Sequence, residues 1–371
     1  MRRNASELSL YNKSSWQEES KDIVNSFSDI YSYIQKFSLD EKTLREIKLG
    51  IDQKGIKIPR FYLEDLIEEV KTEKQKKQLI KFLLPFPEHN ISNEVNDLTT
   101  FLDSHSLDNN PKKGLTRMYV DRVLFSPVHT CSMHCEWCFR DMASGTLRDD
   151  EVDDALTYIE KDCRITDVII TGGEPLLLSN RKISYIIEGL RKIDHVVTIR
   201  FHTRILVTVP SRIDEELISI LRTNKSKGQP FYFVTQYIHP LEITERSSDA
   251  VYRLVNTGIY VYNQAPVLRG VNDDQETFNE WHQKMIKYQI RPYYAITTII
   301  KDGLNSRFYV PFEEVEGLVN NYSSRYDGLG RPTIIIPVMG KKLVPGNLKN
   351  AMNQNGAYVR NTKSEIWKGT T

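Results

Sequence analysis

The chain carries the stretch Cys131-Ser-Met-His-Cys135-Glu-Trp-Cys138-Phe-Arg140, in which three of its four cysteines fall within eight residues at C-x3-C-x2-C spacing. Three thiolates on one short loop can converge on a soft metal centre, and thiolate is the ligand that iron–sulfur clusters and zinc select. The fourth cysteine, Cys163, lies in a segment of helical character with no other cysteine nearby. The spacing therefore predicts a [4Fe–4S] cluster bound by Cys131, Cys135 and Cys138, with one iron open to another ligand.

Two other interpretations of this stretch stay open. One is a zinc site completed by His129 or His134, and the other is a set of three unrelated buried thiols. Zinc sites usually combine two C-x2-C pairs, or one such pair with spaced histidines, and the sequence has neither pattern. We therefore rank both below the cluster.

A second stretch, Asp167-Val-Ile-Ile-Thr-Gly172-Gly173-Glu174-Pro175, is a short apolar run that ends in glycines, as a strand does before a turn. Together with the cysteine spacing and the aromatic Trp137 before the third cysteine, it resembles the radical S-adenosylmethionine (SAM) enzymes. The resemblance implies that the open iron binds SAM and that the reduced cluster cleaves SAM to a 5′-deoxyadenosyl radical. It also implies that the exposed backbone of Gly172, Gly173, Glu174 and Pro175 binds the amino group of SAM.

The composition is that of a soluble globular protein. Of 371 residues, 40% are hydrophobic and 27% charged, and the net charge of +1 gives no reason to expect a nucleic acid or membrane partner. No apolar run approaches the ~20 residues that span a bilayer, and no apolar segment follows the N-terminal Met-Arg-Arg. Cysteines committed to a cluster indicate a reducing compartment, so we expect a cytoplasmic protein.

The chain divides into three predicted parts. Residues 1–113 form a helical N-terminal extension and linker, in which Ser38-Leu-Asp-Glu41 has the character of a capping box. Residues 114–340 alternate between strands and helices, and residues 341–371 form a C-terminal segment that closes the site. The strands are expected at 122–126, 168–171, 196–200, 206–209, 231–235, 259–266, 290–298 and 334–337.

This alternation predicts an α/β fold with a parallel sheet and right-handed crossovers. The cysteine loop and Gly172–Pro175 both follow strands, so both belong at the carboxyl ends of the strands, where α/β barrels build their sites. The resemblance implies a partial (β/α)6 TIM-like barrel of the radical SAM type.

The resemblance narrows further, to the lysine 2,3-aminomutase family. Its motifs occur in order as Gly114-Leu-Thr-Arg-Met-Tyr-Val-Asp-Arg, Cys131-Ser-Met-His-Cys, Thr171-Gly-Gly-Glu-Pro-Leu-Leu, Val209-Pro-Ser-Arg-Ile, Thr235-Gln-Tyr-Ile-His-Pro-Leu-Glu, Leu268-Arg-Gly-Val-Asn-Asp and Arg291-Pro-Tyr-Tyr. The family implies a SAM- and pyridoxal 5′-phosphate (PLP)-dependent shift of an α-amino group to the β-carbon of an amino acid, after the deoxyadenosyl radical abstracts hydrogen from C3. It implies a small amino acid substrate and an electron donor such as flavodoxin or ferredoxin. A homo-oligomer is one open possibility.

The functional residues of the family can be matched to this sequence one at a time. Arg140 matches the arginine that binds the substrate carboxylate, a role that suits a planar guanidinium. Tyr119 and Arg122 match residues that hold the PLP phosphate, but Met118 stands where the family has an arginine. Arg117 is adjacent, although neighbouring residues of a strand point to opposite faces.

The lysine that binds PLP in the family ends a glycine-rich run after a strand. Here the run is Pro337-Val-Met-Gly-Lys341-Lys342, with most of the glycines lost. We prefer Lys341, because Asn347 then falls at the family's spacing, and Lys342 is the alternative. Two solvated loop lysines would give the same pattern.

Substrate recognition departs further from the family. Asp273 matches one of two aspartates that bind the side-chain ammonium of lysine, but Pro337 stands at the position of the second. A buried ammonium with one carboxylate lost is poorly compensated, so another amino acid is the preferred substrate. Gln236 replaces a histidine near SAM and keeps a hydrogen-bonding group there.

Two functions of other classes remain alternatives. The first is a PLP-independent radical SAM enzyme on the aminomutase scaffold, acting as an epimerase, a dehydrogenase or a modifier of peptide side chains. The second is a non-catalytic iron–sulfur or zinc protein, which would have no use for Gly172–Pro175.

Overall fold

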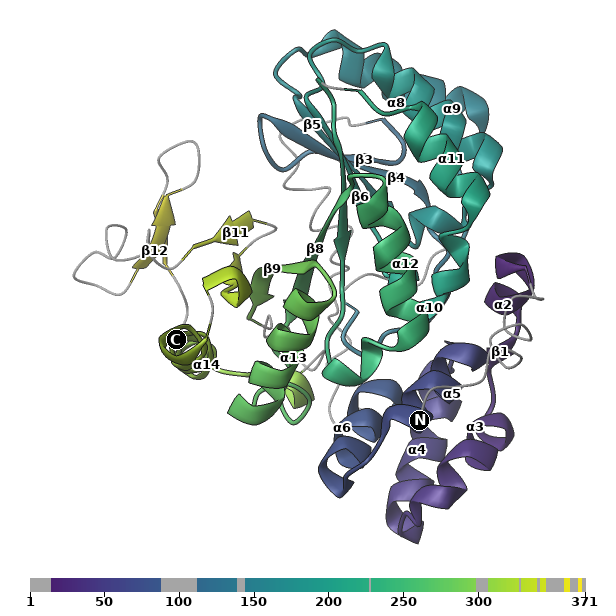
Figure 1. The fold of residues 1–371 in the computed structure, drawn as a ribbon, viewed down its shortest axis with the longest axis vertical. Coiled ribbons are helices and arrows are strands. Elements are labelled where there is room, and N and C mark those ends of the chain that lie inside the picture. The colour runs from purple at the N-terminus through teal and green to yellow at the C-terminus, as the bar shows by residue number, and fades with distance from the viewer. Residues whose placement is uncertain are drawn as a thin grey trace.

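The structure, a computed structural model, describes residues 15–87, 112–138, 144–226, 228–297, 306–326, 328–338, 341–344, 357–360 and 366–368. Its first part is helical and lies against one end of the sheet-containing part (Figure 1). The elements of the helical part are α2 (Trp16–Lys21), β1 (Ile23–Val24), α3 (Phe27–Ile34), η1 (Gln35–Phe37), α4 (Glu41–Lys54), β2 (Ile58–Pro59), α5 (Arg60–Glu69) and α6 (Glu73–Leu83).

Local capping explains where these helices begin. The Asp40 side chain accepts a hydrogen bond from the Thr43 backbone N–H at 2.7 Å and starts α4. The capping box predicted to begin at Ser38 is therefore wrong, because Ser38 ends η1 in the left-handed conformation with φ 49°. Buried Ile47 and Ile51 then face the core from α4.

The second part is built on a nine-stranded sheet of order β11-β10-β9-β8-β7-β6-β5-β4-β3. Its strands are β3 (Leu115–Thr116), β4 (Arg122–Val128), β5 (Asp167–Gly172), β6 (Thr198–His202), β7 (Phe231–Thr235), β8 (Tyr260–Pro266), β9 (Ile290–Ile296), β10 (Thr333–Val338) and β11 (Lys341–Leu343). The strands from β4 to β10 pair in parallel, and β3 and β11 pair antiparallel at the two edges. The predicted α/β fold is confirmed. β10 matches the strand predicted at 334–337 and is a seventh parallel strand, one more than the six of the barrel that the resemblance implies.

Helices connect the strands and cover one face of the sheet, as α8, α9, α11 and α12 do in Figure 1. The helices and 3-10 turns of this part are α8 (Asp149–Lys161), η2 (Pro175–Leu177), α9 (Asn180–Arg191), α10 (Ile205–Thr208), η3 (Pro210–Arg212), α11 (Glu215–Thr223), η4 (Pro240–Glu242), α12 (Glu245–Asn256), α13 (Gln275–Lys287), η5 (Ser306–Phe308), α14 (Phe312–Arg325) and η6 (Gly328–Gly330). A separate hairpin consists of β12 (Ala357–Arg360) and β13 (Ile366–Lys368).

The two faces of the sheet differ in chemistry. On β6, Ile199 and Phe201 are buried, whereas Arg200 and His202 between and after them are only half-buried. The same alternation on β8 buries Val261 and leaves Tyr262 half-buried. Side chains alternate between the two faces of a sheet along each strand. The apolar side chains therefore pack under the helices, and the polar side chains line the opposite face.

The strand predicted at 206–209 is wrong, because Ile205–Thr208 forms the short helix α10. Its β-branched apolar residues favour a strand locally. The chain has just left β6, however, and the Thr208 N–H donates to the Arg204 carbonyl at 3.1 Å in a helical turn. All four residues of α10 are buried, so tertiary packing overrides the local preference.

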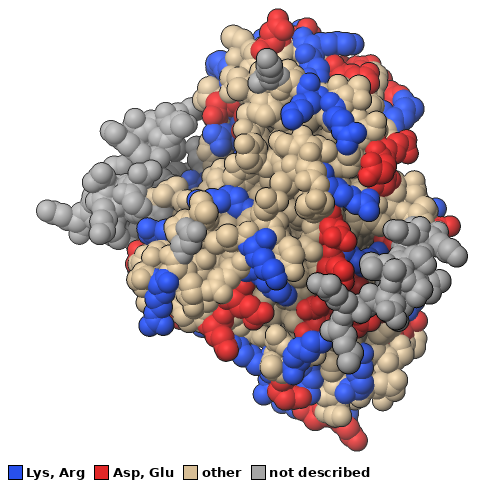
Figure 2. All heavy atoms as spheres, in the orientation of Figure 1, with Lys and Arg blue, Asp and Glu red and all other residues tan. Residues whose placement is uncertain are grey.

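The surface mixes both signs of charge on the visible face (Figure 2). Among the described residues, no helix combines the length and apolar character needed to cross a membrane.

Backbone contacts join the loop after β4 to the turn after β5. The Gly173 N–H donates to the Val128 carbonyl at 2.7 Å, and the Glu174 N–H donates to the Thr130 carbonyl at 2.8 Å. A Cβ atom at Gly173 would lie 2.3 Å from the Thr130 carbonyl oxygen, closer than such atoms approach. A glycine is therefore required for the two segments to meet.

We expect Gly173→Ala to lower the free energy of unfolding by about 2 kcal/mol, because the backbone of the cysteine loop must move to admit the methyl group. Gly317→Ala is the matched control. A Cβ at Gly317, inside α14, would meet nothing within 4 Å, so this change should be neutral or stabilising by about 0.5 kcal/mol. Urea unfolding of both variants measures the difference, and equal stabilities would contradict the close approach at Gly173.

Candidate functional site

The three clustered cysteines lie in the loop that leaves the carboxyl end of β4. Cys131, Cys135 and Cys138 are all partly buried, and the Cys138 N–H donates to the Cys135 carbonyl at 2.9 Å. Cys163 is exposed and precedes β5, so it lies at the opposite, amino end of the parallel strands. Topology thus separates the fourth cysteine from the other three.

The N-terminal part braces this loop. Lys57, next to β2, donates from its Nζ to the Cys131 carbonyl at 2.7 Å, and its own carbonyl accepts from the His134 N–H at 2.9 Å. Sequence reasoning did not connect the helical extension to the cysteine loop, since a lysine before a strand carries no signal of such a contact.

The donor chemistry of the loop fits an iron–sulfur cluster. No group of three or more His, Cys, Asp or Glu within the described ranges is arranged to hold a single metal ion. In a cluster with three protein ligands each thiolate binds a different iron, so the three sulfur atoms need not meet at one point. Burial raises the pKa of the Cys135 thiol to about 11, and the facing Arg204 guanidinium acts in the opposite direction.

The predicted SAM-binding turn lies beside this loop, but the Glu174 side chain turns inward. Its carboxylate accepts from the Thr203 hydroxyl at 2.5 Å, from the Leu176 N–H at 3.1 Å and from the Arg204 N–H at 2.8 Å. Burial raises the pKa of Glu174 to about 7, against these hydrogen bonds. Glu174 therefore ties the end of β5 to the end of β6.

Gln236 also reaches the cysteine loop. It follows β7, and its Oε1 accepts from the Trp137 indole N–H at 3.3 Å. The structure thus brings together Gln236, the cysteines and the Gly172–Pro175 turn at one edge of the sheet.

A second group of predicted residues meets near β11. The Tyr119 hydroxyl accepts from the Lys342 backbone N–H at 2.8 Å, and the Arg122 guanidinium lies 4.9 Å from the centre of the Tyr119 ring. The Lys342 amine donates to Gln264 Oε1 at 3.0 Å and lies 4.5 Å from the centre of the Tyr294 ring.

The Lys342 side chain is exposed as a whole, while its amine contacts Gln264 and the Tyr294 ring. Desolvation of the amine, and then the positive charges of Arg200 and Arg122, lower the pKa of Lys342 to about 8. Lys341 precedes Lys342 on β11. The Lys341 side chain and Asn347 lie outside the described residues.

Arg117 does not replace the arginine missing at Met118. Its buried guanidinium donates to Asp162 at 2.6 Å and to the Val120 carbonyl at 2.7 Å, which holds it behind β3 and α8. Arg200, which the sequence analysis missed, instead shares the region of Arg122 and Lys342. Arg200 lies between the apolar residues Ile199 and Phe201, and this alternation of polar and apolar residues was the sequence signal that could have identified it.

The groups around Lys342 fit an anionic, carbonyl-bearing cofactor such as PLP. An amine with a lowered pKa is a better nucleophile towards an aldehyde, and Arg122, Arg200 and the Tyr119 hydroxyl are donors suited to phosphate. Both arginines already have an acidic partner, since Arg200 binds Asp167 through Nε at 2.9 Å and Arg122 binds Asp121 through Nη2 at 2.8 Å, so part of their charge is balanced.

Arg140 and Asp273 are the two residues predicted to bind the substrate, and the structure describes only the second. Arg140 lies outside the described residues. The Asp273 carboxylate accepts from the Gly270 N–H at 2.6 Å and pairs with Arg269 Nη1 at 3.0 Å. Asp273 therefore already has a cationic partner within its own loop.

Comparisons with known proteins identify the family of this chain. A family model described as the radical SAM superfamily matches residues 125–282. The L-lysine 2,3-aminomutase of Acetoanaerobium sticklandii is 29% identical over 95% of this chain and 83% of its own length. A putative L-lysine 2,3-aminomutase of Aquifex aeolicus is 33% identical over 69% of this chain and 72% of its own length. The glutamate 2,3-aminomutase of Clostridioides difficile is 28% identical over 89% of this chain and 76% of its own length.

The relatives span both the cysteine loop and the strands around it, and the family model covers the sheet from β4 into α13. The chain belongs to the lysine 2,3-aminomutase family of the radical SAM superfamily.

Proposed function

We propose that this chain is an aminomutase that moves the α-amino group of an amino acid to the β-carbon, using a [4Fe–4S] cluster, SAM and PLP. The observation that carries the proposal is the Lys342 amine. It combines a pKa of about 8 with a place beside Tyr119, Arg122 and Arg200, on the same sheet whose carboxyl edge bears the three cysteines. Relatives named lysine and glutamate 2,3-aminomutases support the reaction class.

The proposed roles of the residues follow the order of the strands in the sheet. Cys131, Cys135 and Cys138 would hold the cluster, and the backbone of Gly172 and Gly173 would bind SAM next to it. When bound, SAM and the reduced cluster supply a radical that abstracts hydrogen, and PLP supplies a π-system over which an unpaired electron spreads. The chain's residues place the reacting groups and exclude water.

We assign the PLP lysine to the pair at the start of β11. The family register supports Lys341, and the contacts of Lys342 with Tyr119 and Gln264 support Lys342. We take Lys342 for the experiments below, because its amine shares a region with two arginines.

The substrate we propose is an amino acid other than lysine, with its carboxylate bound by Arg140. Pro337 removes one of the two expected carboxylates, and Asp273 is paired with Arg269. An ammonium group would therefore find neither of the two anions free. An external one-electron donor of the flavodoxin or ferredoxin class and a cytoplasmic location belong to the same proposal.

One observation favours a second candidate, a PLP-independent radical SAM enzyme on the same scaffold. Met118 is buried where the family has a phosphate-binding arginine, and Arg117 is held by Asp162. The two candidates differ in whether the chain binds PLP.

Replacement of any one of Cys131, Cys135 and Cys138 by Ala should abolish cluster assembly, since each supplies one of three protein ligands. Cys163→Ala is the control and should leave assembly intact, because Cys163 is exposed at the other end of the strands. Iron and sulfide content after anaerobic reconstitution measures the result. Loss of iron from Cys163→Ala alone would refute the three-cysteine site.

Borohydride reduction of the protein with PLP should fix a phosphopyridoxyl group on Lys342, as identified by peptide mapping. Lys342→Ala should lose this label while Lys341→Ala keeps it, and the reverse would move the role to Lys341.

Labelling should also depend on pH. Only the neutral amine attacks an aldehyde, so the extent of labelling should rise with pH to a midpoint near 8, below the ordinary lysine pKa of 10.5. No label on either lysine, with SAM cleavage that depends on another substrate, would favour the PLP-independent enzyme.

A further inference from the structure

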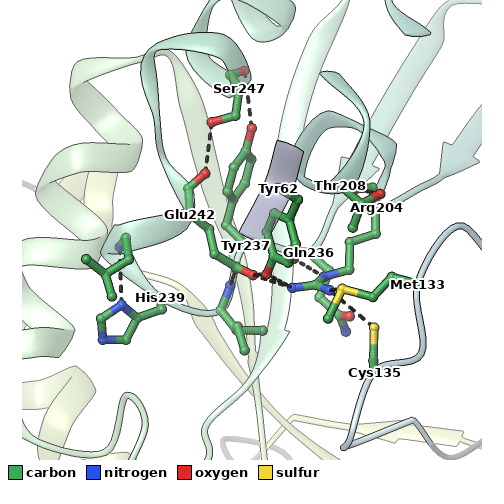
Figure 3. Close-up of polar contacts among 12 residues, drawn as sticks. Tyr62, Met133, Cys135, Arg204, Thr208, Gln236, Tyr237, His239, Glu242 and Ser247 are labelled. Atoms are coloured by element: carbon green, nitrogen blue, oxygen red, sulfur yellow. Dashed lines mark hydrogen bonds and ion pairs between the residues drawn. The ribbon is translucent and has the colours of Figure 1, made fainter. Parts of the chain in front are cut away.

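A largely buried arginine faces one of the cluster cysteines. Arg204 follows β6, and its side chain is 10% exposed. Its Nη1 donates to the Cys135 sulfur at 3.2 Å and contacts the Met133 sulfur at 3.2 Å (Figure 3). Its guanidinium carbon lies 4.8 Å from the centre of the Trp137 ring, so the whole group is packed against the cysteine loop.

The other nitrogens of Arg204 are fixed by groups from three separate segments. Nη2 pairs with Glu242 Oε1 and lies 3.3 Å from the Tyr62 hydroxyl, and Nε donates to the Gln236 carbonyl at 3.2 Å. The backbone N–H of Arg204 is held by Glu174 at 2.8 Å. These contacts leave the guanidinium one orientation, in which Nη1 points at sulfur.

Glu242 is itself held in place. Its side chain is fully buried, its Oε2 accepts from the Ile238 N–H at 2.6 Å, and its Oε1 accepts from the Tyr62 hydroxyl at 2.5 Å. Tyr62 comes from α5 of the N-terminal part, so the helical extension completes the network (Figure 3). The negative charge of Glu242 opposes the positive charge of Arg204.

A hydrogen bond to a ligating sulfur withdraws electron density from an iron–sulfur cluster, and hydrogen bonds of this kind set its reduction potential. Reduction adds one electron and no proton, taking [4Fe–4S]2+ to [4Fe–4S]1+ with the electron supplied by the external donor. The added negative charge strengthens an N–H to sulfur bond, so such a bond favours the reduced form.

We propose that Arg204 is a positioning residue that raises the reduction potential of the cluster through its hydrogen bond to the Cys135 sulfur, and that Glu242 limits this rise. The inference rests on the proposed cluster at Cys131, Cys135 and Cys138, but it requires neither PLP nor a particular substrate. The role of the N-terminal extension is then to hold Tyr62, and with it the Arg204–Glu242 pair, beside the cluster.

The test is a redox titration of the anaerobically reconstituted full chain, without SAM, PLP or amino acid, followed by electron paramagnetic resonance of the reduced cluster. Arg204→Lys keeps the charge but loses the planar fork that spans Cys135 and Glu242. We expect its equilibrium constant for reduction to fall about tenfold, which is about 59 mV for one electron.

Glu242→Gln should shift the potential in the opposite direction, because it removes the negative charge and leaves Arg204 uncompensated. Arg246→Lys is the matched control. Arg246 is also a packed arginine in an ion pair, 2.7 Å from Glu19, and it lies over the Phe61 ring rather than against the cysteine loop. The reduction potential of the cluster in Arg246→Lys should equal that in the unmodified protein.

Opposite shifts in the two variants, with full iron content, support the proposal, since a general loss of packing would not change sign. An unchanged potential in Arg204→Lys, or shifts of the same sign, overturns it. Weakened SAM binding at unchanged potential also overturns it and assigns Arg204 to SAM instead. If Arg204→Lys loses iron, Glu242→Gln decides: a raised potential supports the role, and an unchanged one overturns it. Failure of the unmodified chain to bind any cluster would instead contradict the proposed function.

Discussion

The parallel register of β4 to β9 is the constraint on which the site depends. Because these strands run in one direction, the segments that follow them all emerge at the same edge of the sheet. The cysteine loop follows β4, the glycine turn follows β5, Arg204 follows β6 and Gln236 follows β7. Residues that are more than 100 positions apart in the sequence therefore meet at this edge of the sheet.

Contacts between these loops then fix their relative positions. The Gly173 and Glu174 N–H groups bind carbonyls of the β4 loop, and the Glu174 carboxylate binds the start of the segment after β6. A buried carboxylate is costly unless it is hydrogen-bonded, and three donors meet that need here. The same turn thus joins three segments, since its backbone binds the loop after β4 and its Glu174 side chain binds the segment after β6.

Much of this could be predicted from the sequence, because the signals are local. The cysteine spacing, the Gly172–Pro175 turn and the strand–helix alternation each occupy a short window. The strand predicted at 206–209 was wrong because burial, not local preference, decides its conformation. The network of Tyr62, Arg204 and Glu242 could not be predicted, since it joins residues up to 180 positions apart by side-chain contacts alone. The choice between Lys341 and Lys342 depends on a one-residue register, which motif spacing with lost glycines does not define.

The central claim is that the chain brings a SAM-derived radical to C3 of an amino acid. It is tested most directly by incubating the anaerobically reconstituted protein, with SAM, PLP and a reductant, with a panel of α-amino acids deuterated at C3. The account predicts that one of them, and not lysine, gives deuterium in 5′-deoxyadenosine together with a β-amino acid product. SAM cleavage that leaves deoxyadenosine free of deuterium with every amino acid would contradict it.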